Sequence, residues 1–121
     1  MTIGTIEQLA DAVRQFGRER DWQLYHSPKN LTAALIVEAA ELLEPFQWLT
    51  EEQSHNLPPE KLEAVRQEMA DVLIYLVSLA NTLDLDLLKA AEDKLAINAQ
   101  KYPVETAKGS CAKYNERSGT T

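Results

Sequence analysis

Two acidic couplets, Glu38-x-x-Glu41 and Glu68-x-x-Asp71, lie within otherwise apolar stretches of the sequence. Residues three apart on an α-helix share one face, so each couplet places two carboxylates about one turn apart. Glu38 falls in register with the apolar residues of its helix, and Asp71 interrupts the apolar segment 69–80. Both couplets are therefore expected to point into the protein, where a charged group is costly unless it is paired or bound to a metal.

The four carboxylates together predict a site for a hard divalent cation. Mg²⁺ prefers oxygen ligands and is commonly held by a few carboxylates together with substrate phosphates and water. Ions bound in this way activate water and neutralise charge at phosphorus, which is the chemistry of phosphoryl transfer. The candidate metal ligands and catalytic residues are Glu38, Glu41, Glu68 and Asp71, with Mg²⁺ expected and Mn²⁺ as a substitute.

The couplets also have two non-catalytic explanations. A single Glu-x-x-Glu pair is more often a solvated helix face, although two pairs on consecutive apolar helices weaken that explanation. Alternatively, the chain is a helical binding or assembly module whose inward acids pair with basic residues across an oligomer interface. The candidate partners are Arg14, Arg18, Arg66 and Lys94. Zinc is disfavoured because the sequence lacks clusters of cysteine and histidine. A di-iron bundle is disfavoured because it needs Glu-x-x-His pairs on its helices, and both histidines, His26 and His55, lie outside the predicted helices.

Large aromatic side chains form a second group of candidate functional residues. Trp22, His26 and Trp48 lie in or beside predicted loops, where a helical core does not obviously need them. Aromatic faces stack on nucleobases with little demand on base identity. Tryptophans that fill the ends of a bundle explain the same positions, and Tyr75 can equally be a core residue. These residues are candidates both for a nucleobase pocket and for packing.

Periodicity and helix-breaking residues predict an all-α fold without strands. The predicted helices cover residues 5–20, 30–45, 59–83 and 85–101. Asn30 is the expected N-cap of the second helix, and the segments 21–29 and 50–59 are expected to interrupt the helices. We therefore expect a four-helix bundle-like protomer over residues 1–103, followed by an irregular tail over 104–121.

The third predicted helix carries apolar residues on more than one side. Its main seam has the three-and-four spacing of helical bundles and consists of Leu62, Val65, Met69, Val72, Leu76, Leu79 and Leu83. Leu73, Ile74 and Val77 add apolar side chains elsewhere on the same helix. A helix that is apolar all round is buried on more than one side, which favours an oligomer over a monomer.

Composition excludes several classes of protein. Hydrophobic residues make up 45% of the 121 residues and charged residues 26%, values typical of one soluble globular domain. No apolar run is long enough to span a bilayer, and a single cysteine excludes an internal disulfide framework. The net charge of −7 argues against a nonspecific nucleic-acid binder. We expect a cytoplasmic protein whose anionic ligands arrive with cations.

The acidic couplets and several other motifs resemble a known family. The Glu-x-x-Glu, spacer, Glu-x-x-Asp pattern, with 26 residues between Glu41 and Glu68, is similar to the signature of the MazG-like all-α nucleotide pyrophosphohydrolases. Within that family the chain looks most like the dCTP pyrophosphatase group. The residues that carry this likeness are Glu19-Arg-Asp-Trp22, His26, Pro28-Lys-Asn30-Leu31, Phe46-Gln-Trp48, Asp71-Val-Leu-Ile-Tyr75-Leu and Lys101-Tyr-Pro103. The likeness covers nearly the whole chain.

The resemblance implies roles for individual residues. It implies that the four acids of the couplets hold Mg²⁺, that Trp22, His26, Trp48 and Tyr75 shape the base and sugar pocket, and that Lys94 and Asn98 reach the phosphates. It also implies a homotetramer, in preference to a dimer, with sites at subunit contacts. Val13 and Pro45 depart from the family pattern, because relatives carry a histidine at the first position and continue the helix at the second.

The expected activity is Mg²⁺-dependent hydrolysis of a nucleoside triphosphate to its monophosphate and pyrophosphate. The resemblance favours dCTP or a modified pyrimidine deoxynucleotide as the substrate, in a house-cleaning role. The same chemistry on dUTP or on a broad range of triphosphates is the first alternative. The second is the non-catalytic assembly module described above.

Overall fold

The computed structural model describes residues 2–110 of the chain, and every regular element in this range is helical. The elements are α1 (Ile6–Glu19), the 3₁₀ helix η1 (Trp22–Leu24), α2 (Pro28–Leu43), α3 (Glu51–Ser54), α4 (Pro59–Leu83), α5 (Leu87–Lys101) and α6 (Val104–Ala107). The all-α prediction is therefore confirmed. None of these helices is both long enough and apolar enough to cross a membrane.

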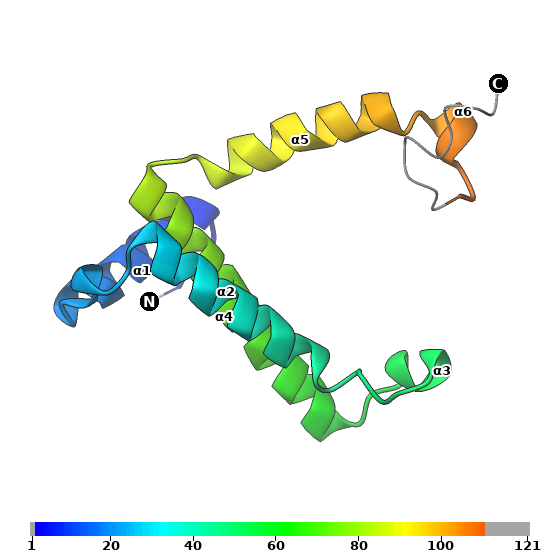
Figure 1. The fold of residues 1–121 in the computed structure, drawn as a ribbon, viewed down its shortest axis with the longest axis horizontal. Coiled ribbons are helices and arrows are strands. Elements are labelled where there is room, and N and C mark those ends of the chain that lie inside the picture. The colour runs from blue at the N-terminus through cyan, green and yellow to red at the C-terminus, as the bar shows by residue number, and fades with distance from the viewer. Residues whose placement is uncertain (1, 111–121) are drawn as a thin grey trace. The chain divides into compact units, whose positions relative to one another are not determined.

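Contacts divide the chain into two compact units, one ending at Leu85 and one beginning at Asp86. In the first unit, α2 packs alongside α4, α1 packs on α4, and η1 lies against α1 (Figure 1). The long helix α4 is thus the element that the other helices share, and the carboxylate residues are carried by α2 and α4. The predicted domain boundary at residue 103 stays a prediction.

The first helix forms where its local signals predict. Thr5 is the N-cap of α1, and its hydroxyl accepts a hydrogen bond of 3.1 Å from the backbone N–H of Gln8. The Gln8 side chain in turn accepts from the backbone N–H of Thr5, which completes a capping box. Beyond the helix, Asp21 adopts a left-handed conformation with φ of 55° and leads into η1, which was not predicted.

The second helix begins two residues earlier than predicted. Ser27, and not Asn30, is its N-cap, and the Ser27 hydroxyl accepts from the backbone N–H of Asn30. Pro28 occupies the first helical position, where its missing N–H costs nothing and its fixed φ suits the helix. The helix ends at Leu43, two residues before the predicted end at Pro45.

The connection between α2 and α4 contains a helix that was not predicted. Thr50 caps the short α3 through a capping box with Gln53, so the polar segment 50–59 is not wholly irregular. The next helix, α4, spans the predicted residues and ends at Asp84, which has a left-handed φ of 54°. Its continuity places Glu68 and the following site residues on one rigid element.

Few apolar side chains are fully buried among the described residues. The buried apolar side chains are Leu31, Val65, Val77 and Ala80. Several residues of the predicted α4 seam are exposed instead, with Leu62 and Met69 both 57% exposed. The predicted seam is therefore only partly buried in the chain, because α1 and α2 cover only part of the apolar surface of α4.

The second unit is built around α5. Asp86 caps this helix by accepting a hydrogen bond of 3.0 Å from the backbone N–H of Lys89. Tyr102 and Pro103 follow, and α6 then forms one short helix in a segment that was expected to be irregular. The rest of the predicted tail, residues 111–121, lies outside the described range.

Candidate metal centre and nucleotide pocket

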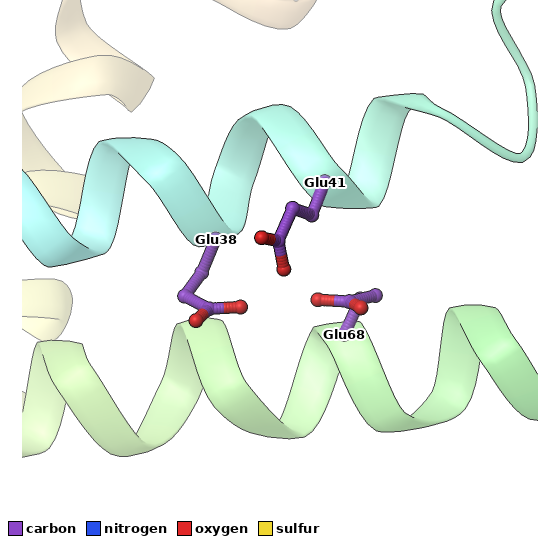
Figure 2. Close-up of side chains that lie close together, drawn as sticks. All are labelled: Glu38, Glu41 and Glu68. Carbon is purple, nitrogen blue, oxygen red and sulfur yellow. The ribbon is translucent and has the colours of Figure 1, made fainter.

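Three of the four predicted acids meet between α2 and α4, and we call them the carboxylate trio. Glu38 and Glu41 extend from α2 toward α4, whereas Glu68 extends from α4 toward α2 (Figure 2). One carboxylate oxygen from each residue lies within 4.8 Å of the others. All three side chains are partly buried. The spacing of three on two packed helices therefore produces one convergent group of oxygen atoms.

Asp71, the fourth acid, is placed differently. It lies one turn after Glu68 on α4, but its side chain is exposed and it does not belong to the trio. The expectation that Asp71 points into a packed interior is wrong for the protomer, because this apolar part of α4 is not covered on every side. The Asp71 charge still raises the pKa of both Glu38 and Glu68, which indicates that it lies near the trio.

The electrostatics of the trio are those of crowded and partly desolvated carboxylates. Burial raises the pKa of Glu38 to about 7, and the neighbouring carboxyls of Glu41 and Glu68 add to this increase. Burial also raises the pKa of Glu68, and the charge of Glu41 acts in the same direction. A metal-free trio therefore repels itself and favours retention of a proton.

The trio lacks compensating partners among residues 2–110. The Oε2 atoms of Glu38 and Glu68 are buried and accept no hydrogen bond within this range. The ion pairs of the described chain involve other acids: Arg14 pairs with Asp11, and Arg66 pairs with Glu63. Buried oxygen atoms without partners are costly unless a ligand satisfies them. The trio therefore fits a divalent cation that takes oxygen ligands.

An aromatic pocket of about 230 Å³ adjoins the acids. Trp22, His26 and Tyr75, three of the predicted base-pocket residues, line it together with Asp71. Trp22 and His26 meet edge to face, with 5.7 Å between their ring centroids. The presence of Asp71 in the wall places the pocket next to the carboxylate trio. The arrangement can hold a planar ring beside a metal centre.

The pocket also contains residues that were not predicted to contribute to it. Phe16, Ile74 and Ser78 line the aromatic pocket, and the ring centroids of Phe16 and Trp22 are 5.6 Å apart. Phe16 recurs at helical spacing with the other apolar residues of α1, a pattern that indicates only a core position, and nothing in the sequence distinguished Ser78. Val13, which departs from the family pattern, also lines the pocket.

The remaining predicted site residues lie elsewhere. Trp48 follows α2, is 87% exposed and does not line the aromatic pocket of the protomer. Lys94 and Asn98 are four residues apart on α5 and so share one face of that helix in the second unit. The roles expected for these three residues stay predictions.

Comparison with known proteins agrees with the motifs. The profile of the MazG-like family matches residues 34–116, a range that contains all four predicted acids. Mouse dCTP pyrophosphatase 1 is 42% identical over 114 residues, which cover 93% of this chain and 67% of the mouse protein. The human dCTP pyrophosphatase 1 is 40% identical with the same coverage.

A solved structure is also similar over most of the chain. It is a pyrophosphatase from Archaeoglobus fulgidus DSM 4304 with 36% sequence identity and a TM-score of 0.78. The similarity covers 85% of this chain and 96% of the archaeal one. Because the family profile matches residues 34–116 and the mouse and human relatives are at least 40% identical over 93% of this chain, the chain belongs to the MazG-like family.

Proposed function

We propose that this MazG-like enzyme is a nucleotide pyrophosphohydrolase acting on dCTP or a modified pyrimidine deoxynucleoside triphosphate. Its products are the nucleoside monophosphate and pyrophosphate, in a house-cleaning role. The identity to dCTP pyrophosphatase 1 and the likeness to the archaeal pyrophosphatase support this class of activity. The observation that carries the proposal is that the carboxylate trio adjoins the aromatic pocket. The two together offer adjacent sites for the phosphates and for the base.

The metal ligands proposed are Glu38, Glu41, Glu68 and Asp71, with Mg²⁺ as the natural ion and Mn²⁺ as a substitute. A bound divalent ion supplies charge neutralisation at the triphosphate and activation of water. The buried Oε2 atoms of Glu38 and Glu68 offer lone pairs that have no partner in the described chain. The exposure of Asp71 leaves its carboxylate accessible from the aromatic pocket, where a substrate would enter.

Hydrolysis requires one water and no covalent enzyme intermediate. A glutamate of the trio orients the attacking water and accepts its proton, while the water oxygen forms a bond to the α-phosphorus. The α–β anhydride bond breaks, and its electron pair leaves with pyrophosphate. The partly buried position of the trio limits access of bulk water to this reaction.

The aromatic pocket is the proposed site of the base and sugar. Trp22, His26 and Tyr75 present ring surfaces, and stacking of a base on such a surface contributes about 1–3 kcal/mol. Trp48 at the base, and Lys94 and Asn98 at the phosphates, complete the proposed contacts. Stacking tolerates any base, so dUTP and a broad set of triphosphates are the alternative substrates for the same chemistry.

Assembly is part of the proposal. We propose a four-helix bundle-like protomer that forms a homo-oligomer, with a tetramer favoured over a dimer. The support is the incomplete burial of α4, where Leu62, Met69 and Leu73 are 42–57% exposed. Exposed apolar surface gains about 25 cal/mol per Å² when it is removed from water, so these side chains favour association.

The decisive experiment identifies the products of a triphosphate panel. The protein is incubated with Mg²⁺ and each deoxynucleoside and ribonucleoside triphosphate in ¹⁸O-labelled water. The products are then separated, and their masses are measured by mass spectrometry. We expect a monophosphate that carries the label and unlabelled pyrophosphate. Release of orthophosphate with a nucleoside diphosphate, or no turnover of any triphosphate, would contradict the proposal.

A matched pair of variants links this activity to the trio. Glu41→Gln removes one carboxylate of the trio, whereas Glu44→Gln makes the same change at an exposed position at the end of α2. Product formation by Glu44→Gln but not by Glu41→Gln is the expected result. Equal activity of the two variants would exclude Glu41 from the site.

A further inference from the structure

A second pocket, of about 270 Å³, lies between α1, η1 and the C-terminal half of α4. Arg14 and Arg18 line it together with polar side chains that include Gln23 and Ser78. Among residues 2–110, no acidic residue contributes to its lining, although the chain has a net charge of −7. We call this cavity the arginine pocket. Two guanidinium groups in one cavity of an acidic protein suit an anionic group.

The two arginines differ in their availability. Arg14 is held by two side chains, since Nη1 lies 3.0 Å from Asp11 Oδ1 and Nη2 lies 3.0 Å from Asn81 Oδ1. Asn81 is itself fixed by a hydrogen bond of 3.0 Å to the Ala10 carbonyl. The Arg18 side chain, in contrast, makes no hydrogen bond or ion pair within residues 2–110. Arg18 is therefore the cation that remains free for a ligand.

The arginine pocket is continuous with the aromatic pocket. Val13, Gly17, His26 and Ser78 line both cavities. Along α4, the residues that face the sites run in the order Glu68 for the trio, Tyr75 for the aromatic pocket and Thr82 for the arginine pocket. At 1.5 Å per residue, Glu68 and Thr82 are about 21 Å apart along the helix axis. The aromatic pocket thus separates the arginines from the acids.

This order determines which part of a nucleotide faces the arginines. With the triphosphate at the acids and the base among the aromatic rings, the edge of the base that is remote from the sugar faces the arginine pocket. In a pyrimidine, C4 lies opposite N1, where the sugar is attached, and C5 is bonded to C4, so the substituents of both atoms point away from the sugar. A substituent at C5 therefore extends beyond the ring on the side away from the sugar.

We propose that the arginine pocket binds an anionic substituent on the base, so that the enzyme prefers pyrimidine triphosphates that carry a carboxylate at C5. This inference rests on the proposed function. Arg18 supplies a planar fork of donors that matches a carboxylate, and Arg14, held by Asp11 and Asn81, adds a second guanidinium in a fixed position, with its charge partly offset by Asp11. Ser78 and Gln23 supply polar groups around the same cavity.

The test compares two substrates whose C5 substituents differ in charge. Values of kcat/KM with Mg²⁺ are measured for 5-carboxy-dCTP and 5-methyl-dCTP in the wild type, in Arg18→Gln and in a control, Arg66→Gln. Arg66 is exposed on α4 outside both pockets. We expect the preference for the carboxylate to fall about 10- to 100-fold in Arg18→Gln, the loss of one charged hydrogen-bonded contact. The control keeps the wild-type preference.

Two kinetic outcomes would overturn the inference. In one, the ratio of kcat/KM for 5-carboxy-dCTP to kcat/KM for 5-methyl-dCTP is the same in the wild type and in Arg18→Gln. The other is an equal fall in kcat/KM for both substrates in Arg18→Gln, because this would make Arg18 a phosphate contact or a residue that stabilises the C-terminal end of α1.

A binding measurement separates this inference from the proposed function. The monophosphates 5-carboxy-dCMP and 5-methyl-dCMP are titrated calorimetrically in the presence of EDTA, so that no turnover or metal is involved. Tighter binding of the carboxylate that weakens with salt and disappears in Arg18→Gln supports the arginine pocket even if no triphosphate is hydrolysed. Hydrolysis of dCTP without any such preference retains the proposed function and rejects the inference.

Discussion

Glu38 on α2 and Glu68 on α4 face each other across the helix interface, and each has a buried carboxylate oxygen without a hydrogen-bond partner in the described chain (Figure 2). Two carboxylates in this arrangement repel each other and lose hydration. Protonation relieves this cost in the metal-free protein, and a divalent cation relieves it more fully. The pair therefore couples the stability of the helix interface to pH and, under the proposed function, also to metal binding.

Mg²⁺ is expected to raise the melting temperature of the protein. Binding to the folded state alone stabilises it by about 2.7 kcal/mol when the free ion is at 100 times its dissociation constant. Differential scanning calorimetry with increasing Mg²⁺ measures the shift. Glu68→Gln should lose most of it, while Glu52→Gln, an exposed acid on α3, should retain it. A melting temperature that does not change with Mg²⁺ or Mn²⁺ would contradict a metal centre in the trio.

Removing one carboxylate should abolish activity without unfolding the protein. In Glu41→Gln or Asp71→Asn we expect kcat to fall by more than about 100-fold, beyond the loss typical of a residue that only supports a metal ligand. The metal-free variants should melt at the same temperature as the wild type or higher, because a like charge has been removed. Circular dichroism and product assays check both parts. A variant with near-normal pyrophosphate release has no metal ligand at that position.

The stability of the metal-free protein is expected to fall as pH rises from about 4.5 to about 7. The folded-state pKa of Glu38 is raised to about 7, so the folded state binds more protons than the unfolded state in this window. Stabilisation by the retained proton is complete below the unfolded pKa and is lost as pH passes the folded pKa. Melting temperatures in EDTA across this range measure the slope, and Glu38→Gln should flatten it. A wild-type slope of the opposite sign would reject the raised pKa.

The same proton should compete with the metal. Mg²⁺ binding requires deprotonated carboxylates, so its apparent affinity should increase with pH through about 7. Calorimetric titration in two buffers of different ionisation enthalpy reveals the protons released on binding. Proton release that disappears in Glu38→Gln is the expected signature, and pH-independent affinity in the wild type would contradict it.

Truncation of Trp22 should weaken substrate recognition more than chemistry. Trp22→Ala removes a ring that contacts Phe16 and His26 in the aromatic pocket, and loss of a stacking surface costs about 1–3 kcal/mol. We expect kcat/KM for dCTP to fall about 5- to 150-fold, mainly through KM. The matched change Trp48→Ala tests the second tryptophan. Unchanged kinetics in both variants would remove the tryptophans from the base site.

A charge on the exposed apolar side of α4 should disrupt assembly. Leu73 is 42% exposed in the protomer, and Leu73→Lys would place an ammonium group in any interface that covers it. Light scattering after size exclusion should show a smaller species than the wild type. Gln67→Lys, a charge added at an exposed polar position of the same helix, is the control. A monomeric wild type would contradict the proposed oligomer.

Local signals in the sequence determined the helices and the faces on which functional residues lie. The three-residue spacing of Glu38 and Glu41 places both on one side of α2 in any structure where that helix forms, because helical geometry is local. The same local signals placed the start of α2 wrongly, because Ser27 and Asn30 are cap residues of similar strength, and they missed α3, which is a polar helix of only four residues.

Tertiary packing decided what the spacing left open. Apolar surroundings in sequence predicted that Asp71 is buried, yet it is exposed, because burial depends on which sides of α4 the other helices cover. The convergence of Glu68 with the α2 acids, the meeting of Trp22, His26 and Tyr75, and the adjoining arginine pocket all arise from contacts between elements distant in the chain. A sequence pattern assigns residues to faces, and only the packing of those faces brings them within reach of one ligand.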